Sequence, residues 1–314
     1  MSTQLDALTH INLNDLVSSF GWENRQFLST LLRKTFIGPA RKFAMQVMDF
    51  DHELGQTNIA EASRRLLRKY YVSDVRVNGR ENIPVTGPTL FLSNHPGMAD
   101  TLSLFAAIGR IDLKIIALQR PFLTHLKNTT SRLFFIDEDP ARRMNAVRLV
   151  SNHLRSGGSV LTFPAGEIEP DPDVYPGALD SLQTWIDSAG VFLRFVRDAK
   201  IVPVLVSGVV WQRAAHHWIP RFKRTRFERE KLAAALQLLV MITRNARPTI
   251  AHVRFARPIT LDEVASLDSQ VIHRTIIERM HGLLAAPHET GVSALYPNTT
   301  ALPELSNNPL IETV

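Results

Sequence analysis

Apolar and polar positions divide this chain into two parts with different periodicity. Before about residue 73, apolar side chains recur at the spacing of helices. The pattern predicts helices over Asn14–Leu32, Ala40–Phe50 and Asn58–Tyr71. A break between the first two is predicted at Gly38-Pro39. Strand signals are few here, so we expect a helical region over residues 1–73.

From Val72 onward, short apolar runs alternate with helical patterns. Strands are predicted at Val75–Val77, Thr89–Ser93, Leu113–Leu118, Arg132–Asp137, Ser159–Phe163, Ile201–Ser207 and Thr249–Phe255. Helices are predicted at Met98–Gly109, Arg142–Leu154, Ser181–Asp198 and Leu261–Leu284, the last capped by Thr260. This alternation is typical of an α/β fold with a mostly parallel sheet flanked by helices, here over residues 74–286, with an N-terminal helical appendage.

Two proline-containing stretches modify this picture. Pro203 falls inside a predicted strand. Because proline lacks the N–H group that a sheet needs, we expect this strand at an edge of the sheet, or Pro203 at the start of the strand. Residues 287–314 are polar and rich in Pro, Asn and Thr, which predicts a poorly ordered tail.

Composition narrows the class of protein. With 45% apolar and 21% charged residues, the chain has the balance of a globular protein. It has no cysteine, which excludes disulfides, thiol nucleophiles and thiolate metal sites. The start has no basic segment followed by an apolar core, so we expect no secretory signal and a cytoplasmic location. The apolar run Leu232–Ile242 is shorter than the roughly 20 residues that a spanning helix needs.

A formal net charge of +6 favours anionic partners. The segment Arg221–Lys231 carries six basic and two acidic residues, and it runs into the apolar stretch Leu232–Ile242. A basic and then apolar helix is typical of an element that lies on a membrane surface. A core helix with solvated first turns fits equally well. Nucleic-acid binding is disfavoured because no recognised binding motif accompanies the charge.

The strongest chemical signal is the stretch Thr89–Leu104, a short apolar run, a polar turn and a helical pattern. The turn holds His95, and Asp100 follows five residues later. A histidine can accept a proton at neutral pH, and a carboxylate can orient its ring. On a straight helix, five residues rotate by about 500°, which leaves two side chains roughly 140° apart. We therefore expect His95 in the turn before the helix.

The same spacing recurs at His10 and Asp15, where no strand precedes it, and we interpret that pair as coincidental. No metal site is expected. The adjacent His216 and His217 point in different directions on a helix or a strand, and no further ligand cluster accompanies them.

Four blocks carry a resemblance to a known family. Asn94-His95-Pro96-Gly97-Met98-Ala99-Asp100 resembles the His-x4-Asp signature of the glycerophospholipid acyltransferase family. Three further blocks follow in the family's order: Phe134-Phe135-Ile136-Asp137, Phe163-Pro164-Ala165-Gly166-Glu167 and Val202-Pro203-Val204.

The resemblance implies an acyltransferase that moves a fatty acyl group from acyl-CoA or acyl carrier protein to a hydroxyl of a glycerol phosphate or lysolipid acceptor. No cofactor would be bound, and the protein would associate peripherally with membranes. His95 would be the general base, oriented by Asp100. Backbone N–H groups near Gly97 or around Gly166 are candidate oxyanion donors. Expected substrate contacts are Asn94, Gly97, Arg142, Arg143, Pro164, Gly166 and Glu167.

This chain departs from the family pattern in two blocks. Ala165 and Ile168 stand where the family usually has Glu and Arg, and Glu138 replaces another Arg. The Phe-Pro-Ala-Gly-Glu variant resembles the branch around hemolysin-like and ornithine-lipid acyltransferases. The lost arginine would have supplied a bidentate phosphate contact, so the acceptor class stays open. A non-enzymatic lipid-binding protein with this fold is the alternative. A serine hydrolase is disfavoured because no Gly-x-Ser-x-Gly occurs.

Overall fold

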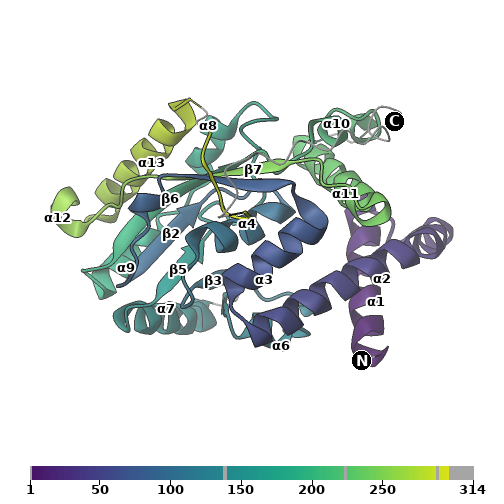
Figure 1. Cartoon of the computed structure of the whole chain (residues 1–314), viewed down its shortest axis with the longest axis horizontal. Helices are drawn as coiled ribbons and strands as arrows, with labels where there is room; N and C mark the ends of the chain where they lie inside the picture. The colour runs from purple at the N-terminus through teal and green to yellow at the C-terminus, as the bar shows by residue number, and fades with distance from the viewer. Residues whose placement is uncertain (1, 137–139, 223–224, 288–289, 297–314) are drawn as a thin grey trace.

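The computed structural model describes residues 2–136, 140–222, 225–287 and 290–296. A twisted sheet of eight strands runs through the molecule, in the order β4-β3-β5-β2-β6-β7-β1-β8, with helices on both faces (Figure 1). The strands are β1 (Asp74–Asn78), β2 (Thr89–Ser93), β3 (Lys114–Leu118), β4 (Leu133–Ile136), β5 (Ser159–Thr162), β6 (Lys200–Ser207), β7 (Ile250–Phe255) and β8 (Val292–Ser293).

The strands from β4 to β6 are all parallel, and β7 pairs antiparallel with β6. β1 is parallel to β7, and β8 is antiparallel to β1. The predicted α/β class with a mostly parallel sheet is therefore confirmed. The seven predicted strands agree with the observed ones to within one residue at each described end, and Asp137 lies outside the described residues.

β2 occupies the middle of the sheet because its side chains are apolar on both faces. All five residues are buried. Phe91 packs into one core with α3 and α4, while Leu90 and Leu92 pack into the other with α7, α9 and α13. Such a strand can lie only where helices cover both sides.

Helices flank the sheet, and further helices precede its first strand in the chain. They are α1 (Ser2–Phe20), α2 (Gln26–Gln56), α3 (Ile59–Leu66), α4 (Met98–Ile108), α5 (Pro121–Thr124), α6 (Lys127–Thr130), α7 (Pro140–Arg155), α8 (Ala178–Ser181), α9 (Ser188–Phe195), α10 (Gln212–Ala215), α11 (Arg226–Arg244), α12 (Leu261–Val264) and α13 (Ser269–Ala285). Four tighter or wider turns are η1 (Leu67–Tyr71), η2 (Arg80–Asn82), η3 (Leu182–Thr184) and η4 (Ile219–Phe222).

The N-terminal helices have two different structural roles. α1 and the first part of α2 lie at one end of the molecule, beyond the sheet (Figure 1). α3 and η1 instead join the main core, because Leu66, Leu67 and Tyr71 are buried in the same cluster as Phe91. Phe50 and Leu54 at the end of α2 belong to this cluster as well, so only α1 and the first part of α2 lie apart from the main core.

The predicted boundaries of the first two helices in this region are wrong, whereas the third agrees with α3 and η1 to within one residue. The break falls at Gly21 (φ 68°), where α1 ends, and Pro39 lies inside the continuous helix α2. A proline inside a helix removes one backbone hydrogen bond. Tertiary contacts from α1 support α2 at this point: Asn12 Nδ2 donates to the Ala40 carbonyl at 3.4 Å, and Arg41 pairs with Asp6 at 3.1 Å.

Pro203 does not lie at an edge, contrary to the prediction, because β6 pairs with both β2 and β7. The ladder with β7 is interrupted beside it. The Ala256 N–H donates to the Pro203 carbonyl, and the next contact joins Ile201 to Ile259. The missing N–H therefore faces a bulge, where proline is tolerated in a sheet.

The C-terminal part also differs in detail. The predicted Leu261–Leu284 helix divides at Ala265, which has a positive φ of 51°, although Thr260 caps its start as expected by accepting from the Glu263 N–H at 3.3 Å. The region Ser181–Asp198 is three short elements rather than one helix. The structure continues beyond the boundary predicted at residue 286, because β8 pairs with β1 and Leu295 is buried. Residues 297–314 of the predicted tail lie outside the described residues.

Candidate active site

His95 lies in the turn between β2 and α4, residues 94–97, which we call the His95 turn. β2 ends at Ser93, and α4 begins at Met98 with Gly97 as its N-cap residue. Asp100 is the third residue of the helix, where its carboxylate can reach back to the cap. The neighbours of β2 in the sheet are β5 and β6, so the loops that follow these two strands flank the His95 turn.

The structure brings His95 and Asp100 into contact, with 2.7 Å between His95 Nδ1 and Asp100 Oδ2. Because an ionised carboxylate only accepts hydrogen bonds, Nδ1 carries the proton in this contact. The other ring nitrogen, Nε2, is left to accept a proton from outside. His95 avoids the 140° separation of a straight helix because it precedes the first helical residue.

Three groups besides His95 donate to the Asp100 carboxylate, which is fully buried. The Gly97 N–H donates to Oδ2 at 2.9 Å, and the Thr101 hydroxyl donates to Oδ1 at 3.0 Å. The Thr101 backbone N–H also donates to Oδ1. These donors compensate the burial of a charged group and fix the plane of the carboxylate.

The His95 ring is partly accessible and is held from one side. Its side chain is 29% exposed, and it stacks on Phe163 with 4.4 Å between ring centroids. Burial alone would lower the pKa of His95, but the negative charges of Asp100 and, less strongly, Glu169 together raise it above its ordinary value. The ring can thus hold a proton that it has accepted.

Glu169 is a site residue that the sequence did not single out. It follows β5 and is 3% exposed. Its Oε2 accepts the backbone N–H of His95 at 3.1 Å, and its own N–H donates to the His95 carbonyl at 2.9 Å. Its Oε1 accepts from Trp185 at 2.8 Å and from Ser181 at 3.1 Å. Burial raises the pKa of Glu169 to about 7.

A second buried carboxylate, Asp171, lies two residues further along the same loop. It accepts the N–H groups of Gly208 and Val210, both at 2.9 Å. Burial raises the pKa of Asp171 to about 6. The Glu169-Pro170-Asp171 segment therefore joins the ends of three strands, with Glu169 on the β2 side and Asp171 on the β6 side.

Asn94 has a structural function rather than the predicted substrate contact. Its Nδ2 donates to the Val206 carbonyl at 2.8 Å, and its Oδ1 accepts the Val206 N–H at 2.7 Å. The side chain is buried, and it extends the backbone pairing between β2 and β6 beyond the end of β2.

Among the candidate oxyanion donors near Gly97 and around Gly166, the N–H groups of these two glycines themselves are occupied within the protein. The Gly97 N–H donates to Asp100, and the Gly166 N–H donates to the Phe163 carbonyl at 3.1 Å. Gly166 has a φ of 69°, which closes the turn after β5 in a conformation that favours glycine. These two N–H groups are therefore not free to stabilise an oxyanion.

The remaining predicted contacts are spread around the site. Pro164 is buried, and its carbonyl accepts the Ile186 N–H at 3.2 Å, so it fixes the loop after β5. Glu167 is exposed on that loop. Arg143 is exposed on α7, the helix that follows β4. In the sheet, β4 is three strands, or roughly 14 Å, from β2. The side chain of Arg142 lies outside the described residues.

Two further observations concern ligands. In the part of the chain that the structure describes, no group of three or more His, Asp or Glu side chains is arranged to hold a metal ion. A cavity of about 760 Å³ lies between η3 and α13, where Trp185 lines it but His95 and Asp100 do not.

Part of the chain matches a known protein family. Residues 74–207, from β1 to the end of β6, match the model of the Acyltransferase family. The chain is also similar to the crystal structure of the 1-acyl-sn-glycerophosphate (LPA) acyltransferase PlsC from Thermotoga maritima. The two are 16% identical, with a TM-score of 0.42, over 90% of this chain and 97% of that one. No curated protein matches the chain.

Proposed function

We propose that this protein transfers a fatty acyl group from an acyl thioester, acyl-CoA or acyl carrier protein, to a hydroxyl of a glycerolipid or lysophospholipid. The observation that carries the proposal is the 2.7 Å contact between His95 and the buried Asp100 at the end of β2, within the segment that matches the family. The ring is accessible, so that a substrate hydroxyl can approach Nε2.

The reaction follows from this geometry. His95 Nε2 takes the proton of the acceptor hydroxyl as its oxygen attacks the thioester carbonyl, and Asp100 stabilises the resulting imidazolium. The tetrahedral intermediate then collapses, the C–S bond breaks and the thiolate leaves with the proton from His95. The new ester carries the acyl group, and no protein atom is acylated.

The acceptor headgroup is the open part of the proposal. The family arginine of the third block is Ile168 here, so the loop after β5 offers no guanidinium at that position to hold a phosphate. Arg143, which is exposed on α7 after β4, is a candidate to bind the headgroup instead. We therefore favour a lysolipid acceptor whose headgroup carries no phosphate monoester over free glycerol 3-phosphate.

Labelled acyl-CoA and acyl carrier protein, each offered with lysophosphatidate, lyso-ornithine lipid or glycerol 3-phosphate, test the proposal. We expect labelled product and thiol release in equal amounts with a lysolipid. Initial velocities should indicate a ternary complex, because no nucleophilic side chain is used. Ping-pong kinetics or an isolable acyl-protein would contradict the direct mechanism. Vesicle binding without transfer to any acceptor would favour the non-enzymatic alternative.

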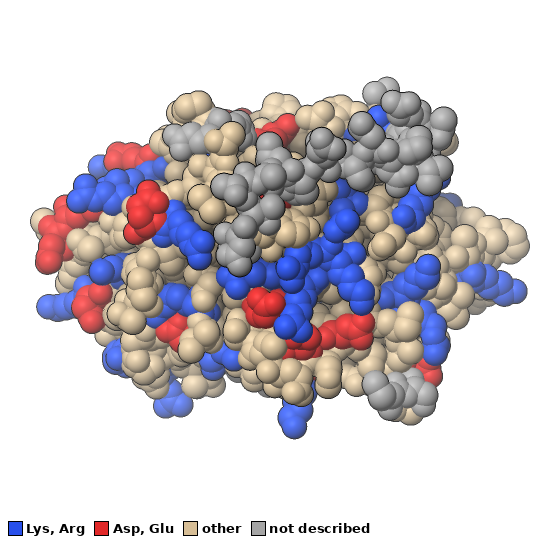
Figure 2. Space-filling model, in the orientation of Figure 1, with Lys and Arg blue, Asp and Glu red and all other residues tan. Residues whose placement is uncertain are grey.

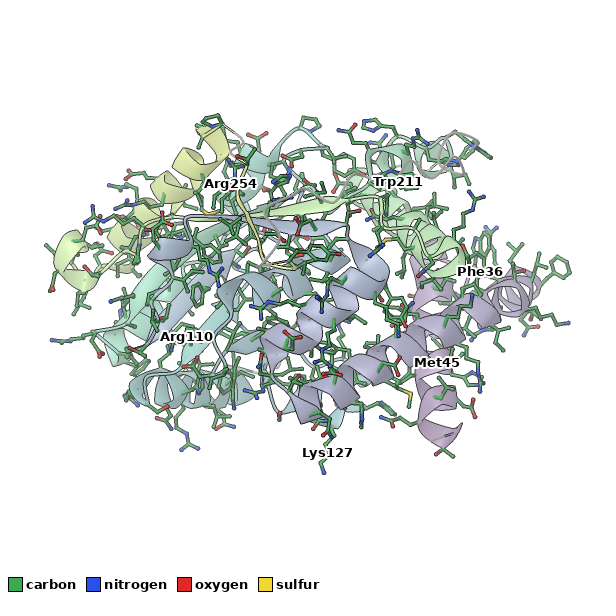
Figure 3. The ribbon with its side chains drawn as sticks, in the orientation of Figure 1. Phe36, Met45, Arg110, Lys127, Trp211 and Arg254 are labelled. Atoms are coloured by element: carbon green, nitrogen blue, oxygen red, sulfur yellow. The ribbon has the colours of Figure 1, made fainter. Side chains whose placement is uncertain are left out.

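We also propose that the protein binds membranes peripherally, through α2 and the segment before α11. No helix within the described residues has the length and apolarity of a membrane span. On α2, Phe27 (79% exposed), Leu31 and Ile37 present apolar side chains to solvent, and Figure 3 places Phe36 and Met45 of this helix at the end of the molecule beyond the sheet.

Aromatic and basic side chains add to this surface. Before α11, which packs next to α2, Trp218 and Phe222 are exposed and stack edge to face at 5.7 Å. Figure 2 shows lysine and arginine side chains gathered over α3 and η1, where Arg65 and Lys69 are exposed. In the predicted basic segment Arg221–Lys231, five of the six basic side chains lie outside the described residues: Arg221, Lys223, Arg224, Arg226 and Lys231.

Replacing Phe27, Leu31 and Ile37 together by serine is expected to lower vesicle binding about tenfold or more, because each apolar side chain buried in lipid contributes about 1.5–3 kcal/mol. Flotation with vesicles that contain anionic lipid measures the bound fraction. The control replaces Val85 and Ile111 by serine. Both residues are exposed, and Ile111 follows Arg110, which Figure 3 shows on the other side of the molecule from Phe36 of α2. Equal losses in the two variants, or no loss in either, would show that α2 is not the binding surface.

A further inference from the structure

The structure assigns Glu169 as a positioning residue that holds the His95 turn in its reactive conformation. This inference rests on the proposed function, since it concerns the residue expected to act as the base. It adds a second carboxylate to the His95–Asp100 pair, and this one acts on the backbone of His95 rather than on its ring.

Two hydrogen bonds join Glu169 to the backbone of His95. The Glu169 carboxylate accepts from the His95 N–H, and the Glu169 N–H donates to the His95 carbonyl. The two residues are 74 positions apart and belong to the loops after neighbouring strands, β5 and β2. Both backbone polar groups of His95 are thus used, which fixes the direction of its Cα–Cβ bond.

The Glu169 side chain is itself fixed by further hydrogen bonds. Trp185 and Ser181 donate to the outer carboxylate oxygen, so both oxygens of Glu169 accept hydrogen bonds. The side chain cannot turn away without leaving a donor buried and unpaired. The Trp185 indole N–H is the closer of the two donors, and the Ser181 hydroxyl also lies 2.8 Å from the Ala178 carbonyl.

Glu169 also acts on the ring electrostatically. Asp100 and Glu169 are the two charged groups whose fields raise the pKa of His95, while Phe163 on the stacked face is uncharged. Loss of the Glu169 charge must therefore lower the pKa of His95. A role limited to packing would leave that pKa unchanged, so the pH profile separates the two roles.

The test is Glu169→Gln, which keeps the shape of the side chain but has one acceptor atom in place of two. In either orientation of the amide, an NH₂ group faces a donor, His95 N–H on one side or Trp185 Nε1 on the other. We expect kcat to fall about 10–100-fold, as for a reacting group that is displaced by a fraction of an ångström, with little change in KM. We expect the acidic limb of the kcat profile to move to lower pH.

Asp171→Asn is the matched control. Asp171 is buried in the same loop and also accepts backbone N–H groups, but from Gly208 and Val210 rather than from His95. Both variants should lower the Tm, and only Glu169→Gln should move the acidic limb. An unchanged kcat and limb in folded Glu169→Gln overturns the inference. A fall in kcat without a shift of the acidic limb also overturns the inference, because loss of packing alone would give that result.

If Glu169→Gln does not fold, the double variant Trp185→Phe with Ser181→Ala removes the two donors to the outer oxygen. These donors lower the pKa of Glu169, so their loss makes it less ionised and again moves the acidic limb to lower pH. An unmoved limb would overturn the inference. The proposed function fails separately, if the wild-type protein transfers no acyl group or His95→Ala retains full activity.

Discussion

Replacing His95 by alanine is expected to lower kcat about 10²–10⁴-fold, the contribution typical of a positioned general base. Nε2 is the only ring nitrogen not engaged by Asp100, and the variant has no group that can take the proton of the acceptor hydroxyl. KM for the thioester should change little, because the base contacts the acceptor hydroxyl. Thiol release from acyl-CoA in the presence of a lysolipid measures the effect.

The chain supplies its own control for this experiment. His10 and Asp15 have the same spacing as His95 and Asp100, but they lie within the straight helix α1, and His10 is exposed. His10→Ala should have wild-type activity. A His95→Ala protein that is folded by circular dichroism and still turns over at the wild-type rate would refute the role of His95 as base. Loss of the Phe163 stacking makes a check on the Tm necessary.

Replacing Asp100 by asparagine is expected to lower kcat about 10³–10⁴-fold while the protein stays folded. The carboxylate accepts from donors on both oxygens: His95 and Gly97 on Oδ2, and Thr101 on Oδ1. If the amide NH₂ replaces Oδ2, it donates to Nδ1 of His95, so that the proton moves to Nε2 and the base is lost. In the other orientation the NH₂ faces the Thr101 N–H, a buried mismatch that costs about 1–3 kcal/mol of stability.

The pH profile of Asp100→Asn gives a second readout. The charge of Asp100 raises the pKa of His95, and a base must be neutral to accept a proton, so wild-type activity rises with pH through that pKa. Removing the charge should move the remaining acidic limb to lower pH. Thr101→Val is the control, because it removes only the hydroxyl on Oδ1 and leaves the His95 contact intact. Equal losses in the two variants would contradict the proposed role of Asp100.

Much of the site was predictable because its central pair is local. His95 and Asp100 are five residues apart, and a buried strand followed by a polar turn and a helix brings them together with little help from the rest of the chain. The strands were predictable for the same kind of reason. β2 is a continuous apolar run, which is stable only when it is covered on both faces.

The predictions failed where contacts between distant parts of the chain determine the local structure. Pro39 and Pro203 were expected to interrupt or displace their elements, but contacts from α1 and a bulge beside β7 accommodate them. Asn94 was expected to contact substrate, yet its amide is used by Val206, 112 residues away. Of the two carboxylates after the third block, the sequence favoured Glu167, whereas the turn at Gly166 leaves Glu167 exposed and Glu169 buried.

The sequence by itself determined the class of fold, the strand that carries the site and the histidine–aspartate pair, because these depend on apolar periodicity and on contacts within five residues. The tertiary structure alone decided which groups support that pair. Burial turns Glu169 and Asp171 from surface carboxylates into acceptors for backbone N–H groups, and burial depends on which strands become neighbours. That order, β5-β2-β6, comes from packing across the whole sheet.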